Sequence, residues 1–486
     1  MSSNSTRMIH QLQADFEKLI ALVTGPEAQT ATLDQIERSL FQQVLRLGLR
    51  LLQLFLLTRV EAESHAPQPR GGLTTVPYHS QKPIRYFSIF GKLIYERAYF
   101  YTPGQPGVCP LDAALNLPAR CYSDLLMESA ELLAVDSAYD KGLAVLTRLL
   151  GVTVSELALE TSVVEQSQVV KPFYRQTAQF PNDDEGRILV AQADGKGVPM
   201  VRSETVAGKA RRGKGDKKTH KKEAIAIAVY TIAPYRRTPR EVAAALFQKG
   251  RPLVKRPRPC HKQIFASLDG KEAAIKRLAA WAARRDGPHI QERVALTDGS
   301  APLQQQVLAK LPGFTLVLDI IHVDEYLWKA GTAIYGEIAP ERAAWVEAQI
   351  LDILSSRTEQ VIQRLEDKAR AVRRSSQAGK VFRQVATYLR RNRPYMDYAD
   401  YLRRGWPIGT GVIEGVCRHL VKDRMELSGM RWTVTGAGAL LALRAVNENG
   451  DWEAFHAFRR RQRHEELYGT PLDESWLDLA ERLEVN

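Results

Sequence analysis

The segment RILVAQAD at residues 187–194 decides the fold, because it joins a run of apolar strand-forming residues to a carboxylate. Three more apolar segments of strand length follow along the chain: EAIAIAVYTI at 223–232, RVALTD at 293–298 and FTLVLDI at 314–320. Helical patterns separate them, such as KEAAIKRLAAWAARR at 271–285. Strands that alternate with helices indicate an α/β domain whose sheet is at least partly parallel.

Two of these segments end in aspartate followed by glycine. Asp194 precedes Gly195, and Asp298 precedes Gly299. A single Asp-Gly pair is more often a turn than a site. Two such pairs at strand ends, with a later acidic residue on a helix, favour a site, because α/β folds place ligands in the crevice beyond the strand ends.

The later acidic residue is Glu414, which follows the glycine-rich break GWPIGTG at 405–411. We expect Thr410 to N-cap the next helix, so that Glu414 lies in its first turn, where the helix dipole favours an ionised carboxylate. Arg418 and Lys422 follow at four-residue steps and would share this face, where they suit a phosphate. The alternative for this segment alone is a salt bridge between Glu414 and Arg418 on a solvated helix.

These three carboxylates suit the chemistry of phosphodiester cleavage. That reaction places negative charge on the attacking and leaving oxygens, and two Mg²⁺ ions about 3.5 to 4 Å apart stabilise it. Carboxylate oxygens are ligands that Mg²⁺ and Mn²⁺ prefer. The sequence therefore predicts that Asp194, Asp298 and Glu414 hold two Mg²⁺ or Mn²⁺ ions.

Several motifs resemble those of one known family. They are DGKGVPM at 194–200, LTDGS at 296–300, LDIIHVDEYLW at 318–328, PIGTGVIEG at 407–415 and LSGMRWTVTGAGALLALRA at 427–445. In this order, from about 84 to 455, the chain resembles the DDE transposases of bacterial insertion sequences, in particular the ISKra-type group.

The resemblance implies an RNase H-like catalytic domain, in which helices flank a mixed sheet. Such a domain carries its first Asp on the first strand, its second after the fourth strand and its Glu on a late helix. Those positions match Asp194, Asp298 and Glu414 in this sequence.

The resemblance also points to Asp319 and His322. Related transposases carry a motif of Cys or Asp, two residues and His after the fifth strand, and this pair would support the metal site. Two alternatives are a strand-end Asp beside a buried His, and Asp319 in place of Asp298 as the second ligand. The family commonly has a cysteine-containing segment before the sequence CP-LD, which only Cys109 matches here, so a zinc-bound module is not supported.

The basic residues are concentrated in one loop. The net charge is +13, and GKARRGKGDKKTHKK at 208–222 alone holds eight Lys and Arg against one Asp. Charge runs usually form solvated faces, but this one follows the Asp194 strand, where it would neutralise DNA phosphates. Trp432 beside Arg431 is a candidate for stacking on an unpaired base, with a core Trp as the alternative. The predicted DNA contacts are Lys209, Arg211, Arg212, Lys214, Lys217, Lys218, Lys221, Lys222, Arg418, Lys422, Arg431 and Trp432.

The whole chain indicates a multidomain α/β plus α protein. Its four cysteines form no CxxC pair, which excludes a disulfide framework and fits a reducing cytoplasm. The most apolar stretch, 47–60, is short and contains Arg50, so we expect no membrane span. A helix-turn-helix pattern lies at 142–164, with plain core packing as the alternative. The expected divisions are a helical arm and linker over 1–80, a hairpin with a helical DNA-binding region over 81–180, the catalytic domain over 181–338 and 405–464, a helical insertion over 339–404 and a tail over 465–486.

Together these features predict a transposase. It would bind the terminal inverted repeats of its element as double-stranded DNA, cleave the element ends to free 3′-hydroxyls and join them to target DNA. We expect a homodimer or larger oligomer on DNA, in the cytoplasm at the nucleoid. The alternatives are an RNase H-like nuclease or resolvase without strand transfer, and a transposase-derived DNA-binding protein with an inactive site.

Overall fold

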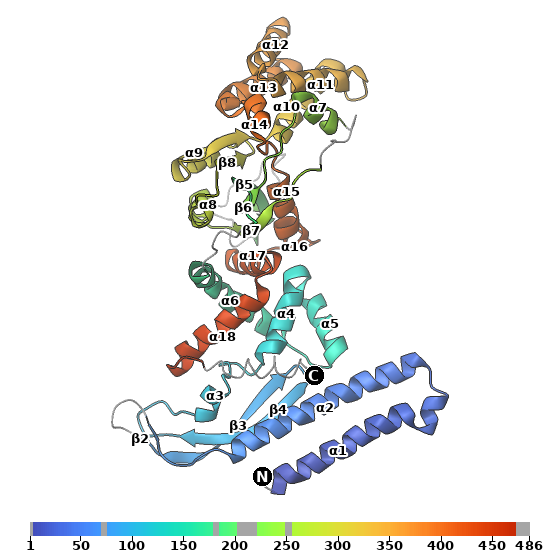
Figure 1. Ribbon diagram of the computed structural model, residues 1–486, viewed down its shortest axis with the longest axis vertical. Coiled ribbons are helices and arrows are strands. Elements are labelled where there is room, and N and C mark those ends of the chain that lie inside the picture. Colours follow the sequence, from blue (N-terminus) through green and yellow to red (C-terminus); the bar gives the residue numbers. More distant parts are fainter. Residues whose placement is uncertain (1–2, 70–74, 178–183, 202–220, 248–254, 473–486) are drawn as a thin grey trace, which may run out of the picture. The chain divides into compact units, whose positions relative to one another are not determined.

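A computed structural model describes residues 3–69, 75–177, 184–201, 221–247 and 255–472. The chain divides into two compact units. Unit 1 comprises residues 1–169 and 452–486, and unit 2 comprises residues 170–451. Unit 1 is thus built from both ends of the sequence. Figure 1 shows the elements of each unit.

Unit 2 contains a five-stranded mixed sheet in the order β7-β6-β5-β8-β9. The central strand β5 pairs in parallel with β8, which pairs in parallel with β9, whereas β6 runs antiparallel to both β5 and β7. The expectation of a partly parallel α/β sheet is therefore confirmed. The strand bounds are β5 (Ile188–Pro199), β6 (Lys221–Ile232), β7 (Cys260–Ser267), β8 (Glu292–Thr297) and β9 (Thr315–Leu318).

β5 corrects one sequence expectation. The Asp194-Gly195 pair was expected to end the strand, but β5 continues to Pro199. The reason is β6, which is antiparallel to β5 and supplies backbone partners along its full length, from Ile188 to Pro199. Gly195 therefore stays extended instead of turning.

Helices lie against both sides of the strands. α8 (Lys271–Arg285) and α15 (Gly411–Val416) both pack on β5 and β6, and Figure 1 draws them on either side of the strands. The other helices of this unit are α7 (Pro239–Leu246), α9 (Ala301–Lys310), α10 (Ile320–Tyr335), α11 (Glu341–Leu354), α12 (Thr358–Ala371), α13 (Gln377–Asn392), α14 (Tyr398–Arg404), α16 (Asp423–Met425) and α17 (Val434–Glu448).

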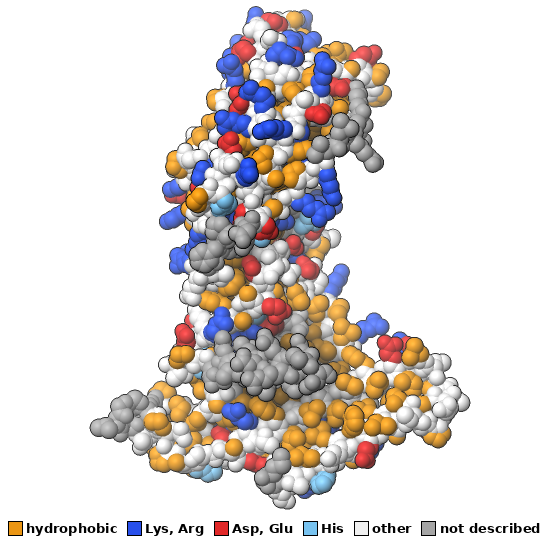
Figure 2. Space-filling model, viewed as in Figure 1, with side chains coloured by type: hydrophobic (Ala, Val, Ile, Leu, Met, Phe, Trp, Pro, Cys, Tyr) orange, Lys and Arg blue, Asp and Glu red, His pale blue; other side chains and the backbone are white. Residues whose placement is uncertain are grey.

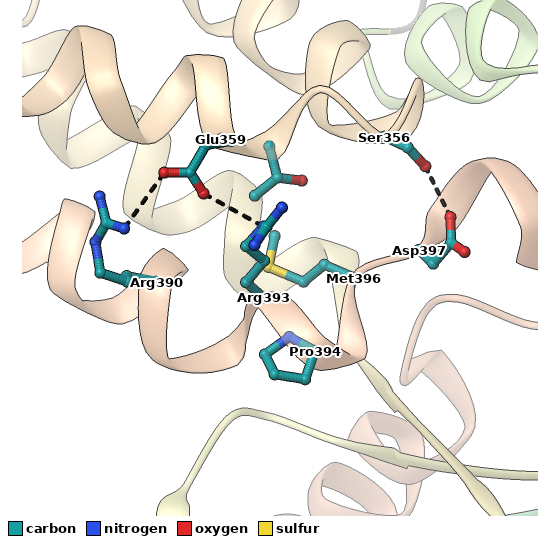
Figure 3. Close-up of a pocket in the computed structure, with 8 residues that line it drawn as sticks. Ser356, Glu359, Arg390, Arg393, Pro394, Met396 and Asp397 are labelled. Carbon is teal, nitrogen blue, oxygen red and sulfur yellow. Dashed lines mark hydrogen bonds and ion pairs between the residues drawn. The ribbon is translucent and has the colours of Figure 1, made fainter.

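The insertion expected over 339–404 is helical, as α11 to α14 show. Buried side chains of these helices and of α10 join those of β5, β8 and β9 in one hydrophobic core. These helices are therefore anchored to the sheet. Lys and Arg side chains are frequent over this part of the surface in Figure 2. In a hollow of about 390 Å³ between α12 and α13, Arg390 and Arg393 both pair with Glu359 (Figure 3).

The described part of unit 1 consists of helices and two antiparallel strand pairs, β1 with β2 and β3 with β4. The hairpin expected over 83–101 is present, although its first strand begins earlier, at Tyr78. The helical pattern at 142–164 forms α5 and α6, with left-handed Gly151 between them (φ 68°) and Ser155 accepting a bond from the Ala158 N–H at 3.2 Å. The elements are α1 (Ser3–Thr24), α2 (Leu33–Glu61), β1 (Gln68–Pro69), β2 (Thr75–Val76), β3 (Tyr78–Ser88), β4 (Gly91–Phe100), α3 (Pro110–Ala114), α4 (Asp124–Asp136), α5 (Tyr139–Leu150), the first part of α6 (Glu156–Gln176) and α18 (Trp452–Tyr468).

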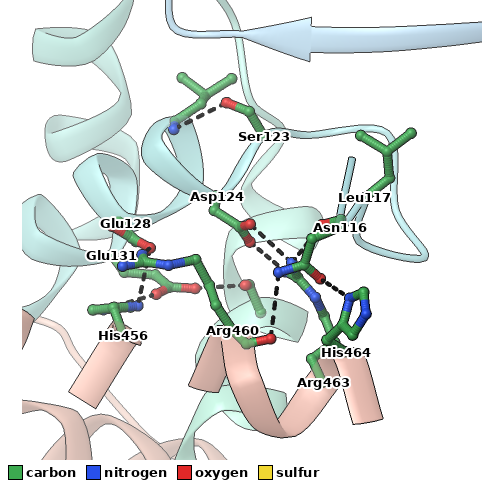
Figure 4. A network of polar contacts seen from close by, with 12 residues as sticks. Asn116, Leu117, Ser123, Asp124, Glu128, Glu131, His456, Arg460, Arg463 and His464 are labelled. Atoms are coloured by element: carbon green, nitrogen blue, oxygen red, sulfur yellow. Dashed lines mark hydrogen bonds and ion pairs between the residues drawn. The ribbon is translucent and has the colours of Figure 1, made fainter. Parts of the chain in front are cut away.

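A buried polar network joins α4 to α18 within unit 1 (Figure 4). Arg463 forms a two-pronged ion pair with Asp124, and Arg460 pairs with Glu128. His456 lies 3.8 Å from the carboxylate of Glu131, and both side chains are almost fully buried. In these ion pairs α18 supplies the arginines and α4 supplies the carboxylates.

Candidate metal centre

Asp194 and Asp298 lie where the parallel pairing of β5 with β8 ends. The β5–β8 pairing ends at Gln192 opposite Leu296, so Asp194 projects two residues beyond it, while Asp298 follows the last residue of β8. Asp298 is fixed by its own loop, because its Oδ1 accepts the Ser300 N–H at 2.8 Å. Both carboxylates are half-buried. The parallel strands thus bring the two predicted aspartates near enough for the charge of Asp298 to act on Asp194.

The pKa of Asp194 responds to burial and to the charge of Asp298. Burial raises the pKa of Asp194, the Gly195 N–H that bonds its Oδ1 at 2.6 Å lowers it, and the negative charge of Asp298 raises it again. His322 lowers this pKa slightly. Repulsion between two half-buried carboxylates is relieved by a bound cation, which accounts for their suitability as metal ligands.

Glu414 meets a second group, formed by Asp319 and His322. One potential ligand atom from each of the three lies within 4.8 Å of the others. Among the residues that the structure describes, this is the one such group of His, Cys, Asp and Glu side chains. Thr410 lies between them, with its hydroxyl 2.6 Å from Asp319 Oδ2 and 3.0 Å from Glu414 Oε1.

Asp319 is fully buried and its oxygens are occupied. Its Oδ1 accepts the backbone N–H groups of Ile321 at 3.1 Å and Thr410 at 3.2 Å, and its Oδ2 accepts from the Thr410 hydroxyl. His322 Nδ1 lies 2.7 Å from the same Oδ2. Asp319 therefore caps α10, whereas the hydrogen bond described for the half-buried Asp298 carboxylate engages only its Oδ1.

The contact with Asp319 also fixes His322. It raises the pKa of His322 to about 9, although burial opposes the shift. Because Nδ1 faces Asp319, the nitrogen that His322 can offer to a ligand is Nε2. The carboxylate and the imidazole thus act as an oriented pair beside Glu414.

The helix that carries Glu414 departs from the expected geometry. α15 ends at Val416, and Cys417–Lys422 forms a π-helix before α16. Thr410 occupies the N-cap position, but its side chain makes no capping bond because its hydroxyl faces the two carboxylates. No ion pair in the described part of the chain joins Glu414 to Arg418. Arg418 and Lys422 are exposed, so both remain placed to meet a solvent-side ligand.

Two neighbours of the site were missed from the sequence. Cys417 Sγ lies 3.5 Å from Asp194 Oδ2 and connects the Glu414 helix to β5, and burial raises its pKa strongly. Gln192, buried in β5, accepts the Ile413 N–H at 3.0 Å. Cys417 stands three residues after Glu414, a spacing that signals a shared helix face. No spacing or motif in the sequence marks Gln192 as a neighbour of the site.

The predicted DNA contacts divide into three groups. Lys209, Arg211, Arg212, Lys214, Lys217 and Lys218 lie outside the described residues. Lys221 and Lys222 begin β6, where Lys221 pairs with Glu426. Arg431 is exposed.

Trp432 has a packing role in the structure. It is half-buried, its indole N–H donates to the Met425 carbonyl at 3.0 Å, and the Arg424 guanidinium lies 5.1 Å from its ring. Its backbone N–H bonds the Pro199 carbonyl at 3.0 Å, at the end of β5. Trp432 therefore ties the segment after α16 to the strand that carries Asp194.

The cysteine considered for zinc, Cys109, lies at the start of α3, where it is half-buried and forms no disulfide.

No family model matches the sequence, and no curated protein matches it. Among solved structures, the Drosophila P element transposase strand transfer complex matches with a TM-score of 0.24 and 8% identity, over 75% of this chain and 86% of that chain. A likeness at this level does not establish a shared fold.

Proposed function

We propose that this chain is a DDE transposase that cleaves DNA at the ends of its element and joins the 3′ ends to target DNA. The observation that carries the proposal is that Asp194 and Asp298 both lie just beyond the parallel pairing of β5 with β8 and interact electrostatically, while Cys417, three residues after Glu414, contacts Asp194. Asp194 lies on the first strand of the sheet, Asp298 after the fourth and Glu414 on a late helix. This is the arrangement that an RNase H-like DDE domain requires.

The residues at the site fit two Mg²⁺ or Mn²⁺ ions. Asp194, Asp298 and Glu414 would supply hard oxygen ligands, and the mutual repulsion of the two aspartates favours cations between them. When bound, such ions stabilise charge on the attacking and leaving oxygens of a phosphodiester. Asp319 holds His322 and Thr410 in place, and the exposed Arg418 and Lys422 would meet substrate phosphates.

The wider assignment follows from this chemistry. Its partner would be double-stranded DNA, as element ends and as target, bound by a homodimer or larger oligomer at the nucleoid. The basic segment 208–222 would add affinity without sequence preference, because phosphate contacts carry no base identity.

The test is a cleavage and joining assay on DNA that flanks the gene. The full chain is incubated with labelled flanking duplexes and a plasmid target in Mg²⁺, Mn²⁺, Ca²⁺ or EDTA. We expect cleaved ends and joined products with Mg²⁺ or Mn²⁺ only, and loss of both in Glu414→Gln with DNA binding retained. Asp423→Asn, an exposed carboxylate on α16, is the matched control and should remain active.

Each other outcome has a distinct meaning. Cleavage without joining would replace the proposal with a nuclease or resolvase. Binding without cleavage in any metal would indicate a DNA-binding protein with an inactive site, and full cleavage in EDTA would overturn the metal assignment.

A further inference from the structure

One face of α13 forms a basic hollow near the candidate metal centre. Lys380, Arg383, Thr387 and Arg391 follow one another at steps of three or four residues, which places them on one side of the helix. With Gln384 they line a hollow of about 460 Å³. Tyr326 from α10 and Tyr388 line it as well, with their rings stacked 3.8 Å apart.

Two direct contacts join this hollow to the loop of Asp298. The Tyr388 hydroxyl donates to the Asp298 carbonyl at 3.2 Å, and Arg391 donates to the Gly299 carbonyl at 2.6 Å. Gly299 has a φ of +89°, and a side chain there would meet the Tyr388 hydroxyl at 2.8 Å. The hollow is therefore held against the loop that presents one predicted metal ligand.

Arg383 donates to the Arg374 carbonyl and Arg391 to the Gly299 carbonyl, and the described residues supply no acidic partner for the charges of the hollow. No acidic side chain lines it, and no ion pair in the described part of the chain includes Lys380, Arg383 or Arg391. The hollow that Glu359 of α12 lines differs, since Arg390 and Arg393 there both pair with Glu359 (Figure 3). Unpaired cations in a concave surface attract an anion with several charges.

We propose that this α13 hollow binds the backbone phosphates of the DNA strand whose scissile phosphate lies at Asp298, an inference that rests on the proposed function. From Lys380 to Arg391 the helix rises about 16 Å, close to the axial length of four to five nucleotides of one strand. Arginine forks match phosphate oxygens in pairs.

The two tyrosines form a floor for this surface. Each stacked face of Tyr326 is engaged, one by Tyr388 and the other by the Lys329 ammonium at 4.3 Å from the ring centre. The Tyr326 ring is thus occupied, and the Arg391 guanidinium lies 5.8 Å from the centre of the Tyr388 ring. Recognition in the hollow depends on phosphates and is independent of base sequence.

The experiment measures how salt changes the affinity for a labelled duplex, in Ca²⁺ without cleavage. We expect the double variant Lys380→Gln/Arg383→Gln to reduce the log-log salt slope by about 1.8, because each lost phosphate contact removes about 0.9. The matched control, Arg390→Gln/Arg393→Gln, removes the same charge from paired residues and should leave the slope unchanged.

The possible results distinguish failure of the hollow proposal from failure of the proposed function. If the wild-type protein binds duplex DNA and the Lys380/Arg383 variant has the same salt slope, the hollow does not bind phosphates. The transposase proposal would be unaffected by that result. Equal losses in both double variants would show a general charge effect and would also overturn the hollow proposal. Wild-type protein that binds no duplex would overturn both.

A second surface, on unit 1, carries an independent inference. Phe16, Ile20 and Val23 on α1 are about half exposed, at spacings of four and three residues. Four large apolar residues on α2 are also about half exposed, at the heptad-compatible positions Phe41, Val44, Leu51 and Phe55. Figure 2 shows hydrophobic side chains gathered over these two helices.

The charges on α2 indicate what covers this surface. By length and composition α2 could cross a membrane, with a mean hydropathy of 1.3 over an 18-residue window that is 6% buried. However, Arg46 and Arg50 lie near its middle, and Arg50 forms an ion pair with Asp15 of α1. Charges at the middle of a bilayer are strongly disfavoured, whereas a protein interface accommodates arginine.

We infer that the α1–α2 surface binds the same surface of a second copy of this chain. Seven half-exposed side chains present on the order of 700 Å² of apolar area, close to the roughly 800 Å² per partner of a standard interface. A twofold axis makes one such surface its own complement. Neither the apolar area nor the symmetry argument depends on the proposed function.

Sedimentation of the full chain tests this inference. We expect wild-type protein to be dimeric at micromolar concentration and Val44→Glu/Leu51→Glu to be monomeric, since burying two carboxylates at the interface is costly. Gln42→Glu/Gln43→Glu adds the same charge to exposed polar positions of α2 and should remain dimeric. A monomeric wild type, or one that binds neutral phosphatidylcholine vesicles through α2, would overturn the inference.

Discussion

Asp298 and Asp319 show how two aspartates in one crevice acquire different roles. Asp319 is fully buried, and its oxygens accept bonds from α10, Thr410 and His322. Asp298 is half-buried, and one of its oxygens is bound by the Ser300 N–H. A carboxylate whose two oxygens both accept hydrogen bonds orients the donor groups. A carboxylate with one oxygen not used in this way can bind an ion.

We therefore predict a difference in kind between Asp298→Asn and Asp319→Asn. Asp298→Asn should abolish DNA cleavage at every Mg²⁺ concentration, because a metal ligand is lost. Asp319→Asn should lower cleavage by about 10 to 100-fold, as losses of orienting partners typically do. Cleavage rates across a Mg²⁺ titration check this, and the reverse ranking would make Asp319 the ligand.

Gly299 is constrained by both its backbone and its neighbour. Its φ of +89° suits glycine, and Tyr388 leaves no room for a methyl group. We predict that Gly299→Ala lowers the free energy of unfolding by about 1–3 kcal/mol, in the range of other strained residues. Gly313→Ala, where only Arg293 lies within 4 Å, is the control and should be nearly neutral in urea unfolding. Equal effects would refute the steric argument.

At the scale of elements, α4 and α18 meet through two buried groups of opposite titration behaviour. Burial raises the pKa of Glu131 to about 8, and burial together with Arg460 and Arg459 lowers the pKa of His456 to about 3. Both groups are therefore neutral at pH 7. The 3.8 Å approach of their side chains is a contact of neutral groups and not an ion pair.

This pairing predicts a pH dependence of stability. Unfolded Glu131 ionises near 4.5 while the folded group stays protonated to about 8, so the folded state binds more protons in this window. The Glu131 contribution to the free energy of unfolding should thus fall as pH rises from about 4.5 to 8, whereas His456, with its lowered pKa, adds the opposite slope between about 3 and 6.5, so we expect the net fall between about 6.5 and 8. Glu131→Gln, which stays neutral, should flatten this fall in urea unfolding at pH 5, 6.5 and 8. A variant with the wild-type slope would show that Glu131 ionises in the folded protein.

The elements also show what the sequence could and could not predict. β5, β6, β8 and β9 were recognisable because their apolar runs are long enough to be buried strands. β7, with the sequence CHKQIFAS, begins with polar residues and was missed. The extension of β5 beyond Asp194 depends on pairing with β6, and the π-helix at 417–422 depends on packing, so neither is encoded locally.

At the scale of the whole molecule, the candidate site is assembled from distant segments. Asp194, Asp298 and Glu414 were identifiable as candidates from residue type and local context. The parallel pairing of β5 with β8 brings Asp194 and Asp298 to neighbouring positions, contacts of Cys417 and Ile413 join the Glu414 segment to β5, and the Glu414 carboxylate itself meets Asp319 and His322; no local pattern reveals these relations. The candidate residues were therefore recognisable from the sequence, whereas their arrangement was not.

Unit 1 depends on charged partners supplied by the end of the chain. Arg463 is almost fully buried and paired with Asp124, so we predict that Arg463→Met lowers the free energy of unfolding by about 3 kcal/mol, as breaking a buried pair does. Arg38→Met breaks an exposed pair with Asp34 and should cause no measurable change. Thermal unfolding compares the two, and similar melting temperatures would show that the buried pair is dispensable.

The division of unit 1 between residues 1–169 and 452–486 has a consequence for synthesis. On the ribosome, α4 emerges before α18 by the whole of unit 2, an interval on the order of half a minute at about 5–20 residues per second. Throughout that time Asp124, Glu128 and Glu131 lack the helix that covers them. The nascent chain therefore completes its first unit last, and a messenger that ends prematurely yields a protein whose opening segment is exposed to proteases.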